Sequence, residues 1–478
     1  MVRRRIDASH IVAFQHGEHR YLRGGTIVTD GNEIVHVGPS YDGPVDETID
    51  ASGMVATPGF VNTHAHLYES PLDKSFVEDL GRRQFYLSGL FEYLPVRSAA
   101  MDDEAAYACL AYSMAELLRT GTTTVLEIGS YAEEAARQAE RFGLRLYMGL
   151  GYRSGRWCTD DGKRVRYAWD EQAGLDGLQR AIDFIERHDG TQNGRLKGFL
   201  SPAQVDTCTE DLLRRSRDAA THLGVPLALH TSQSVNEFLE MTQRHGKTPI
   251  EWLRDIGFLG PDVILGHCIV LAPGSWTNWS GDDIAILADT GTNVAHCVWV
   301  FARRGIAMES FARYLARGVN MTLGTDTCPQ SMIEGLRYTA VVGKIVDRQT
   351  EVATAADVFN AATLGGARAL GRDDLGRLAP GAKADILLWA GDSLFMTPLR
   401  DPIRNLVYSA QAEDLHTVII DGEVRLRDRA VPGVDVGELA RNLQAAGERM
   451  WANTARGDWA GRTIDELAPQ TFPAFVAE

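Results

Sequence analysis

Short apolar segments alternate with amphipathic ones through the middle of the chain. Eight apolar segments have the continuous hydrophobic character of strands buried on both faces. They cover residues 59–66, 122–129, 144–152, 197–204, 225–232, 263–268, 293–300 and 320–327. Between them lie helical patterns with start and stop signals, one running from Asp102 to Gly121 and another from Thr209 to Gly224. This alternation predicts an α/β fold in which eight parallel strands form a TIM-like (β/α)8 barrel.

A different pattern occupies the two ends of the chain. Residues 1–57 and 376–436 contain short alternating strands separated by Gly and Pro turns. We expect them to pair into one small β-sandwich module, with residues 58–375 forming the barrel between them. Residues 437–478 form a tail that we expect to pack on the barrel or on a neighbouring subunit.

Composition narrows the class of partner. The 478 residues carry a formal net charge of −16, which disfavours nucleic acids and anionic membranes and favours a small neutral or cationic partner. No stretch has the uncharged apolar length of a membrane helix. The six cysteines show no CxxC spacing, as expected for reduced thiols. We expect a cytoplasmic homo-oligomer that acts on a small-molecule substrate, with no nucleic-acid or membrane partner.

Metal-ligand side chains stand where several predicted strands end. His64 and His66 close the first strand, His230 the fifth, His267 the sixth and Asp326 the eighth. The carboxyl ends of barrel strands form the functional face, and residues two apart on a strand point the same way. Imidazoles and a carboxylate suit a borderline divalent metal. The sequence therefore predicts a metal centre with an open position for water. Zinc is the default ion, and iron, cobalt or manganese are alternatives.

The chain resembles the amidohydrolase superfamily in motifs that span nearly its whole length. These motifs are IDASGMVATPGFVNTHAHL, GHC at 266–268, GTD at 324–326, and AATLGGARALG followed by GRLAPGAKADILLW. Within the superfamily, the pattern is similar to the branch of cytosine deaminase and triazine hydrolase. The resemblance implies a hydrolase of carbon–nitrogen bonds other than peptide bonds.

The resemblance also implies roles for the strand-end residues. In this branch one metal is held by two strand-one histidines, a strand-five histidine and a strand-eight aspartate, here His64, His66, His230 and Asp326. Related two-metal members use a carboxylated lysine at the end of strand four, whereas the lysine at position 197 stands at the start of that strand, so one metal is expected. His267 and Asp326 are the expected catalytic residues: His267 stabilises the developing oxyanion or takes a proton, and Asp326 relays the proton of water to the leaving group.

Gln233 departs from the pattern of the deaminases, which carry a glutamate three residues after the strand-five histidine. An amide cannot titrate, so a shuttle that protonates the ring of the substrate is unavailable. We therefore expect hydrolysis of a urea, carbamate, thiocarbamate or amide carbonyl, as in the phenylurea and molinate hydrolases that the chain also resembles. One alternative is deamination or dechlorination of an N-heterocycle, and another is a non-catalytic barrel subunit. Gln233 is alternatively structural, as a cap of the next helix.

Aromatic residues are frequent in the segments that follow the predicted strands. We expect Phe85, Tyr152, Trp157 and Trp299 to contact a partly apolar substrate together with Gln233. Alternatively, these rings cover one another or a subunit interface. His296, at the end of the seventh strand, is either a further substrate contact or a hydrogen-bonded structural residue.

Overall fold

Eight strand positions form a ring in the larger part of the molecule. The computed structural model describes residues 2–76 and 83–475. In chain order the ring consists of β5 (Phe60–Ala65), β6 (Thr122–Gly129), β7 (Arg145–Tyr152), β10 (Leu196–Gly198) with β11 (Ser201–Pro202), β12 (Leu227–Thr231), β13 (Val263–His267), β14 (Asn293–His296) and β15 (Met321–Leu323). Neighbours pair in parallel in two ladders, one from β5 to β10 and β11, the other from β12 to β15.

Isolated bridges join the two ladders at both edges. Leu200 pairs with Leu227, Gln204 with His230, and Ala65 with Asp326. The last bridge is secured by two backbone hydrogen bonds, from the His66 amide to the Asp326 carbonyl (2.7 Å) and from the Asp326 amide to the His64 carbonyl (2.9 Å). The predicted (β/α)8 architecture is confirmed, and the bridges bring the first and last strands side by side.

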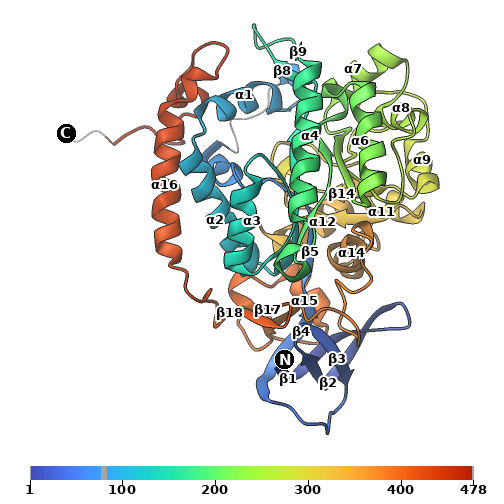
Figure 1. The fold of residues 1–478 in the computed structure, drawn as a ribbon, viewed down its shortest axis with the longest axis vertical. Helices are drawn as coiled ribbons and strands as arrows, with labels where there is room; N and C mark the ends of the chain where they lie inside the picture. The colour runs from blue at the N-terminus through green and yellow to red at the C-terminus, as the bar shows by residue number, and fades with distance from the viewer. Residues whose placement is uncertain (1, 77–82, 476–478) are drawn as a thin grey trace.

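Helices cover the outside of the ring (Figure 1). They are α2 (Asp103–Arg119), α3 (Ala132–Phe142), α4 (Glu171–His188), α6 (Glu210–Leu223), α7 (Val235–His245), α8 (Pro249–Asp255), α9 (Asp283–Thr290), α11 (Phe311–Ala316), α12 (Met332–Asp347), α13 (Ala355–Asn360) and α14 (Gly366–Ala369). The predicted caps are present: Asp102 accepts from the Ala105 amide (2.7 Å), and Thr209 from the Leu212 amide (3.3 Å). Gly224 ends α6 with φ of +67°, a conformation that glycine adopts without strain.

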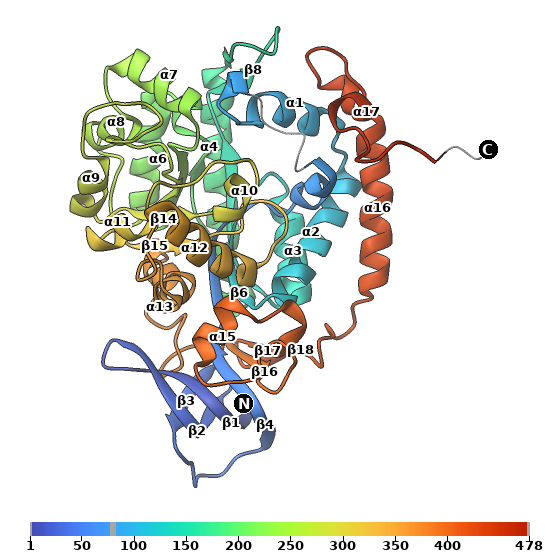
Figure 2. The ribbon, with the colours of Figure 1, turned by 180° about the vertical axis from the view of Figure 1, so that it is seen from behind.

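The two ends of the chain form one β module below the barrel (Figures 1 and 2). Its strands are β1 (Arg3–Gln15), β2 (Glu18–Asp30), β3 (Glu33–Gly38), β4 (Glu47–Pro58), β16 (Ile386–Ala390), β17 (Leu415–Ile420) and β18 (Glu423–Arg427). They join into a single seven-stranded sheet in the order β18-β17-β16-β4-β1-β2-β3, so strands from both ends meet where β4 pairs with β16. A buried apolar cluster that includes Ile6, Ile27 and Leu388 lies on one face of it.

The C-terminal tail packs on the barrel through α16 (Val436–Ala452). This helix runs beside α2 in both ribbon views (Figures 1 and 2), where Ala446 and Met450 join a buried cluster with Cys109. The Arg449 guanidinium also pairs with Asp102 at 3.0 Å. The short helices α15 (Pro402–Tyr408) and α17 (Ile464–Leu467) lie before and after this region in the chain.

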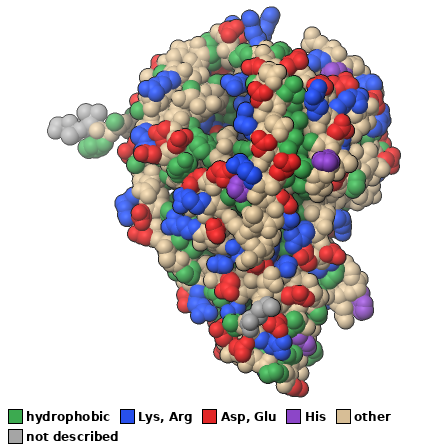
Figure 3. Space-filling model, in the orientation of Figure 1, with side chains coloured by type: hydrophobic (Ala, Val, Ile, Leu, Met, Phe, Trp, Pro, Cys, Tyr) green, Lys and Arg blue, Asp and Glu red, His purple; other side chains and the backbone are tan. Residues whose placement is uncertain are grey.

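The surface carries both signs of charge. In the view of Figure 3, Lys and Arg side chains are interspersed with Asp and Glu over the whole face. Within residues 2–76 and 83–475, no helix combines the length and apolar character required to cross a membrane.

A buried ion cluster links the barrel to the β module. Arg145 opens β7, is fully buried, and its guanidinium lies 3.2 Å from Asp385 Oδ1 and 3.2 Å from Asp421 Oδ1. Asp385 precedes β16, and Asp421 lies in the turn between β17 and β18. Asp421 has one further cation, Arg195, at the longer distance of 3.9 Å. Removal of the Arg145 cation therefore leaves Asp385 without its buried cation and Asp421 with a weakened one.

We therefore expect Arg145→Met to lower the free energy of unfolding by about 3–5 kcal/mol in urea denaturation. The control is Arg137→Met, because Arg137 also pairs with a carboxylate, Glu134, but its side chain is 63% exposed. An exposed pair is worth less than about 1 kcal/mol. Equal losses in the two variants would show that the buried cluster does not hold the module in place.

Candidate metal centre and active-site cavity

Strand ends bring the predicted ligands together. The ligand atoms of His64, His66 and His230 lie within 4.8 Å of one another. Asp326 completes the group, with Oδ1 3.6 Å from His66 Nε2. The four residues come from the ends of β5, β12 and β15, so the group sits at the carboxyl end of the ring, where the sequence placed it.

The hydrogen bonds of His66 and His230 fix which ring nitrogens carry protons. His66 Nδ1 lies 2.8 Å from the Ile128 carbonyl oxygen, and His230 Nδ1 lies 2.6 Å from the Ala203 carbonyl oxygen. A carbonyl only accepts, so each Nδ1 donates and each neutral ring keeps its lone pair on Nε2. The two Nε2 atoms face each other at 3.1 Å. Two lone pairs at this distance repel unless a cation lies between them.

The spacing of these nitrogens suits a metal ion. Two nitrogens bound tetrahedrally to one zinc ion, each about 2.0–2.1 Å from it, lie roughly 3.3 Å apart. The contacts of each Nδ1 with a backbone carbonyl are also the arrangement that orients metal-binding histidines in other proteins. His64 Nε2 is buried beside them with no hydrogen-bond partner among the described residues. The donor set therefore fits a divalent metal held by His64, His66, His230 and Asp326.

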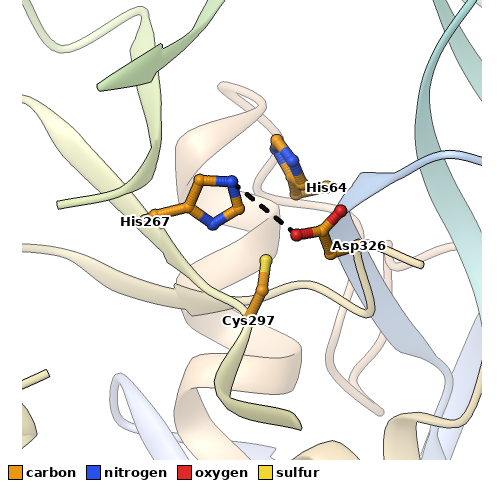
Figure 4. Close-up of side chains that lie close together, drawn as sticks. All are labelled: His64, His267, Cys297 and Asp326. Atoms are coloured by element: carbon orange, nitrogen blue, oxygen red, sulfur yellow. Dashed lines mark ion pairs between the residues drawn. The ribbon is translucent and has the colours of Figure 1, made fainter. Parts of the chain in front are cut away.

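His267 and Cys297 lie next to His64 and Asp326. Figure 4 shows these two side chains close to those of His64 and Asp326, with His267 Nε2 3.7 Å from Asp326 Oδ2. The ligand atoms of these four residues also fall within 4.8 Å of one another. Burial holds the pKa of the Cys297 thiol well above its usual value, which disfavours the thiolate form that binds metals.

Burial keeps the imidazoles neutral. It lowers the pKa of His66 to about 4, and burial followed by the charge of His66 lowers the pKa of His230 to about 4. The pKa values of His64 and His267 lie well below their usual value for the same leading reason. Burial raises the pKa of Asp326, and the nearby His230 opposes the shift. Neutral imidazole is the form that coordinates a metal, so the site is prepared for a cation at neutral pH.

A cavity of about 650 Å³ adjoins the centre and is lined by His66, His230, His267 and Asp326. Its walls come from α1 (Leu90–Ala100), the hairpin of β8 (Gly155–Cys158) and β9 (Arg166–Trp169), and the segment around α10 (Val298–Ala302). Lys197, in β10, is not among the described residues that line the cavity. Its ammonium instead pairs with Asp189 at 3.1 Å.

Gln233 lies in the cavity wall rather than at a helix cap. The N-cap of α7 is Ser234, whose hydroxyl accepts from the Glu237 amide at 3.2 Å. The Glu237 carboxylate in turn accepts from the Ser232 amide and, at 3.3 Å, from the Gln233 amide. Gln233 Nε2 is buried without a hydrogen-bond partner in the described part of the chain. Ser234 rather than Gln233 is therefore the helix cap, and the Gln233 side chain lies in the cavity wall beside the Glu237 carboxylate.

The other predicted substrate contacts divide into two groups. Tyr152 and Trp157 line the cavity, and Trp157 Nε1 is fixed by a hydrogen bond of 2.7 Å to Asp206. Phe85, Trp299 and His296 are not among the described residues that line it. Each of the three packs against another ring, which for Phe85 and Trp299 is the alternative that the sequence left open. The partners are Phe91 for Phe85 (5.6 Å between ring centroids), Tyr338 for Trp299 (4.5 Å) and Phe311 for His296 (5.6 Å). His296 differs from its own alternative, because its Nδ1 is buried with no hydrogen-bond partner among the described residues.

The cavity also contains residues that the sequence reasoning missed. Glu69 and Arg97 line it and form an ion pair with each other. Arg304 lines it as well, in the segment after α10. Phe301, by contrast, belongs to the aromatic residues that follow the predicted strands, and it packs against His267 with ring centroids 4.7 Å apart. Glu69 could have been found from the sequence, because it stands three residues after the predicted ligand His66. Arg97 and Arg304 stand at no such spacing from a predicted ligand, so the sequence does not distinguish them from ordinary surface residues.

The fold and donor set together define a metal-dependent hydrolase built on a barrel. Residues 55–425 match the Amidohydrolase family, and the chain belongs to that family. It is an enzyme of the group that acts on carbon–nitrogen bonds other than peptide bonds, which argues against the alternative of a non-catalytic subunit.

Relatives cover almost the whole chain. A 5'-deoxyadenosine deaminase from Methanosarcina mazei is 30% identical over 435 residues, or 90% of this chain and 94% of that protein. A 5-methylthioadenosine/S-adenosylhomocysteine deaminase from Desulforudis audaxviator is also 30% identical over 435 residues, covering 89% and 95%.

Solved structures share the fold. An adenosine deaminase from Xanthomonas campestris with bound zinc has a TM-score of 0.81 at 24% identity, covering 94% of this chain and 98% of that one. An atrazine chlorohydrolase from Arthrobacter aurescens, complexed with zinc, has a TM-score of 0.81 at 22% identity, covering 93% and 100%. The predicted structural likeness to the triazine hydrolases is thus confirmed, while closeness to phenylurea or molinate hydrolases stays a prediction.

The ligand assignment predicts a loss of bound metal on mutation. We expect His230→Ala to reduce the zinc bound per chain at least about tenfold under dialysis, because one of four ligands is lost and His66 loses the partner that shares the ion. Elemental analysis of the purified protein measures this. His245→Ala is the control, since His245 stacks on Trp252 outside the centre (4.5 Å between centroids) and should leave the zinc content unchanged. Wild-type zinc content in His230→Ala would contradict the assignment.

Proposed function

We propose that the protein is a metal-dependent deaminase of an amino-substituted N-heterocycle, with adenine nucleosides as the leading substrate class. Two relatives that each span about nine tenths of this chain are deaminases of such nucleosides. The sequence favoured carbonyl hydrolysis and gave deamination as the alternative. The relatives support the alternative, because they are deaminases.

One observation carries the proposal. The imidazole and carboxylate cluster and the side-chain amide of Gln233 line the same cavity. When bound, one divalent metal supplies the Lewis acidity that makes water a nucleophile near neutral pH. A substrate ring in this cavity therefore meets a nucleophile, a proton carrier and a hydrogen-bond donor together.

The residues of this chain then have distinct roles. Asp326 takes the proton of the attacking water and passes it to the departing amine, which leaves as ammonia. His267, within 3.7 Å of Asp326, donates a hydrogen bond to the oxygen that becomes the product carbonyl. The side-chain amide of Gln233 donates to a ring nitrogen and orients the ring, but transfers no proton.

Gln233 also favours a second candidate. Hydrolysis of a urea, carbamate, thiocarbamate or amide needs no ring protonation, because the electrophile is a carbonyl that Lewis acidity polarises directly. In that reaction the Gln233 amide would orient the carbonyl or the leaving nitrogen. This candidate retains the roles of His267 and Asp326 and differs in the bond that breaks.

A substrate panel decides between the candidates. We expect the zinc-loaded protein to release ammonia from 5'-deoxyadenosine or 5-methylthioadenosine, and little amine or thiol from a phenylurea or a thiocarbamate. Asp326→Asn serves as the inactive control, with a loss of at least about 10²-fold in kcat, because the proton carrier is removed. Turnover of the phenylurea or thiocarbamate alone would replace the first candidate by the second.

Restoring an acid at position 233 tests how the site works without one. We expect Gln233→Glu to raise kcat/KM for ammonia release about 10²-fold, since general acid catalysis contributes on that order. Carbonyl hydrolysis should gain nothing. Gln204→Glu is a matched control, because Gln204 also lines the cavity and its replacement adds the same charge. Equal effects of the two substitutions would show that charge alone, and not proton transfer at position 233, is responsible.

A further inference from the structure

The cavity differs in charge from the protein as a whole. The chain carries a formal net charge of −16. Among the described residues that line the cavity, however, five are arginines and four are acidic. The arginines are Arg97, Arg153, Arg156, Arg180 and Arg304. A bound divalent cation would make this interior more positive still.

The acidic residues are already engaged. Glu69 and Asp73 both pair with Arg97, whose Nη1 lies 2.8 Å from Asp73 Oδ2. Asp170 caps α4 by accepting from the Ala173 amide at 3.0 Å, and Asp326 belongs to the metal centre. Among the described residues of the cavity, the only ion pairs between an arginine and a carboxylate are those of Arg97, and the charges of Asp73 and Asp326 act on Arg304 without an ion pair to it.

Arg304 is the arginine that most clearly lacks a partner. It follows α10, where the Arg304 amide donates to the Phe301 carbonyl (2.9 Å), and the chain turns at Gly305 with φ of +79°. Its Nε is buried without a hydrogen-bond partner, and the structure shows no ion pair to its guanidinium within residues 2–76 and 83–475. Phe301 and Ile306 flank it in the cavity wall.

The neighbouring Arg303 has a different task. Its Nη1 donates to the Cys328 carbonyl at 3.2 Å and its Nη2 to the Thr327 hydroxyl at 3.3 Å, so it fixes the segment after β15. Burial, and then repulsion from Arg303, lower the pKa of Arg304 to about 10, which leaves Arg304 charged at neutral pH. A charged guanidinium that is partly desolvated and unpaired is costly, and an anion in the cavity would relieve that cost.

We propose that Arg304 is a specificity-determining residue that binds an anionic group of the substrate, a carboxylate or a phosphate. Guanidinium presents paired N–H donors that match two oxygens of either group. Arg304 reaches the cavity from the β14 side of the ring, whereas Arg153 follows β7 on the opposite side, so Arg304 acts separately from the arginines near the hairpin. The inference rests on the cavity of the proposed function, but not on which bond of the substrate is broken.

Binding of simple probes to the zinc-loaded protein tests the proposal without turnover. Benzoate, phenyl phosphate and the neutral benzamide share a ring and differ in the anion, and isothermal calorimetry gives their Kd values. We expect at least one anion to bind about tenfold more tightly than benzamide in the wild type, and this preference to disappear in Arg304→Gln. Arg304→Lys should retain part of it. The probe whose Kd rises more in Arg304→Gln shows whether the anionic group of the substrate is a carboxylate, as in benzoate, or a phosphate, as in phenyl phosphate.

Two further variants distinguish Arg304 from the other arginines of the chain. Arg313→Gln makes the same charge change at an exposed site that pairs with Glu309 at 3.8 Å, and should keep the anion preference. Arg153→Gln tests the opposite wall. An anion preference that survives in Arg304→Gln, or that is lost only in Arg153→Gln, would overturn the proposal. Because no product is measured, failure of the deaminase assignment leaves this result unaffected, and the reverse also holds.

Discussion

Two backbone carbonyls determine what the centre can bind. The carbonyls of Ile128 and Ala203 accept the Nδ1 protons of His66 and His230, and so turn both Nε2 lone pairs toward one point, 3.1 Å apart. Both carbonyls lie at the ends of strands, so the metal site depends on the register of the barrel. The bridges that join the two ladders, Gln204 with His230 and Ala65 with Asp326, involve the same ligands or their neighbours. The candidate ligands therefore come together only when the two ladders pair and the ring closes.

The fold and the clustering of the candidate ligands could be predicted because both follow short periodic rules. Apolar segments of strand length indicated the eight strand positions, and a ligand-type residue at the end of a strand indicated His64, His66, His230 and Asp326. Asp102 and Thr209 predicted helix starts by a local hydrogen bond. These features depend on residues within a few positions of one another, or on where strands end.

The cavity wall could not be predicted in the same way. Trp157 and Trp299 both follow strands and have the same side chain, yet one lines the cavity and the other stacks on Tyr338. The direction of each depends on partners far away in the sequence, such as Asp206 for Trp157. The charge of the cavity could not be predicted for a related reason: the net charge averages over the whole chain and gives no sign that five arginines line the cavity. Carbonyl hydrolysis was placed before deamination because one residue, Gln233, outweighed the pattern of the entire chain, whereas the relatives that cover the chain are deaminases.

The arrangement of the β module has a consequence for synthesis on the ribosome. β4 pairs on one edge with β1, but its other edge waits for β16, and the Trp389 indole donates to the Thr57 hydroxyl (3.0 Å) across a separation of 332 positions. Until the later strand emerges, the nascent chain exposes an open, apolar edge of the kind that pairs with other molecules. The barrel segment is therefore synthesised before the sheet of the β module is complete. When residues 385–390 have been translated, β16 can pair with the free edge of β4, and Asp385 can form its ion pair with the Arg145 guanidinium.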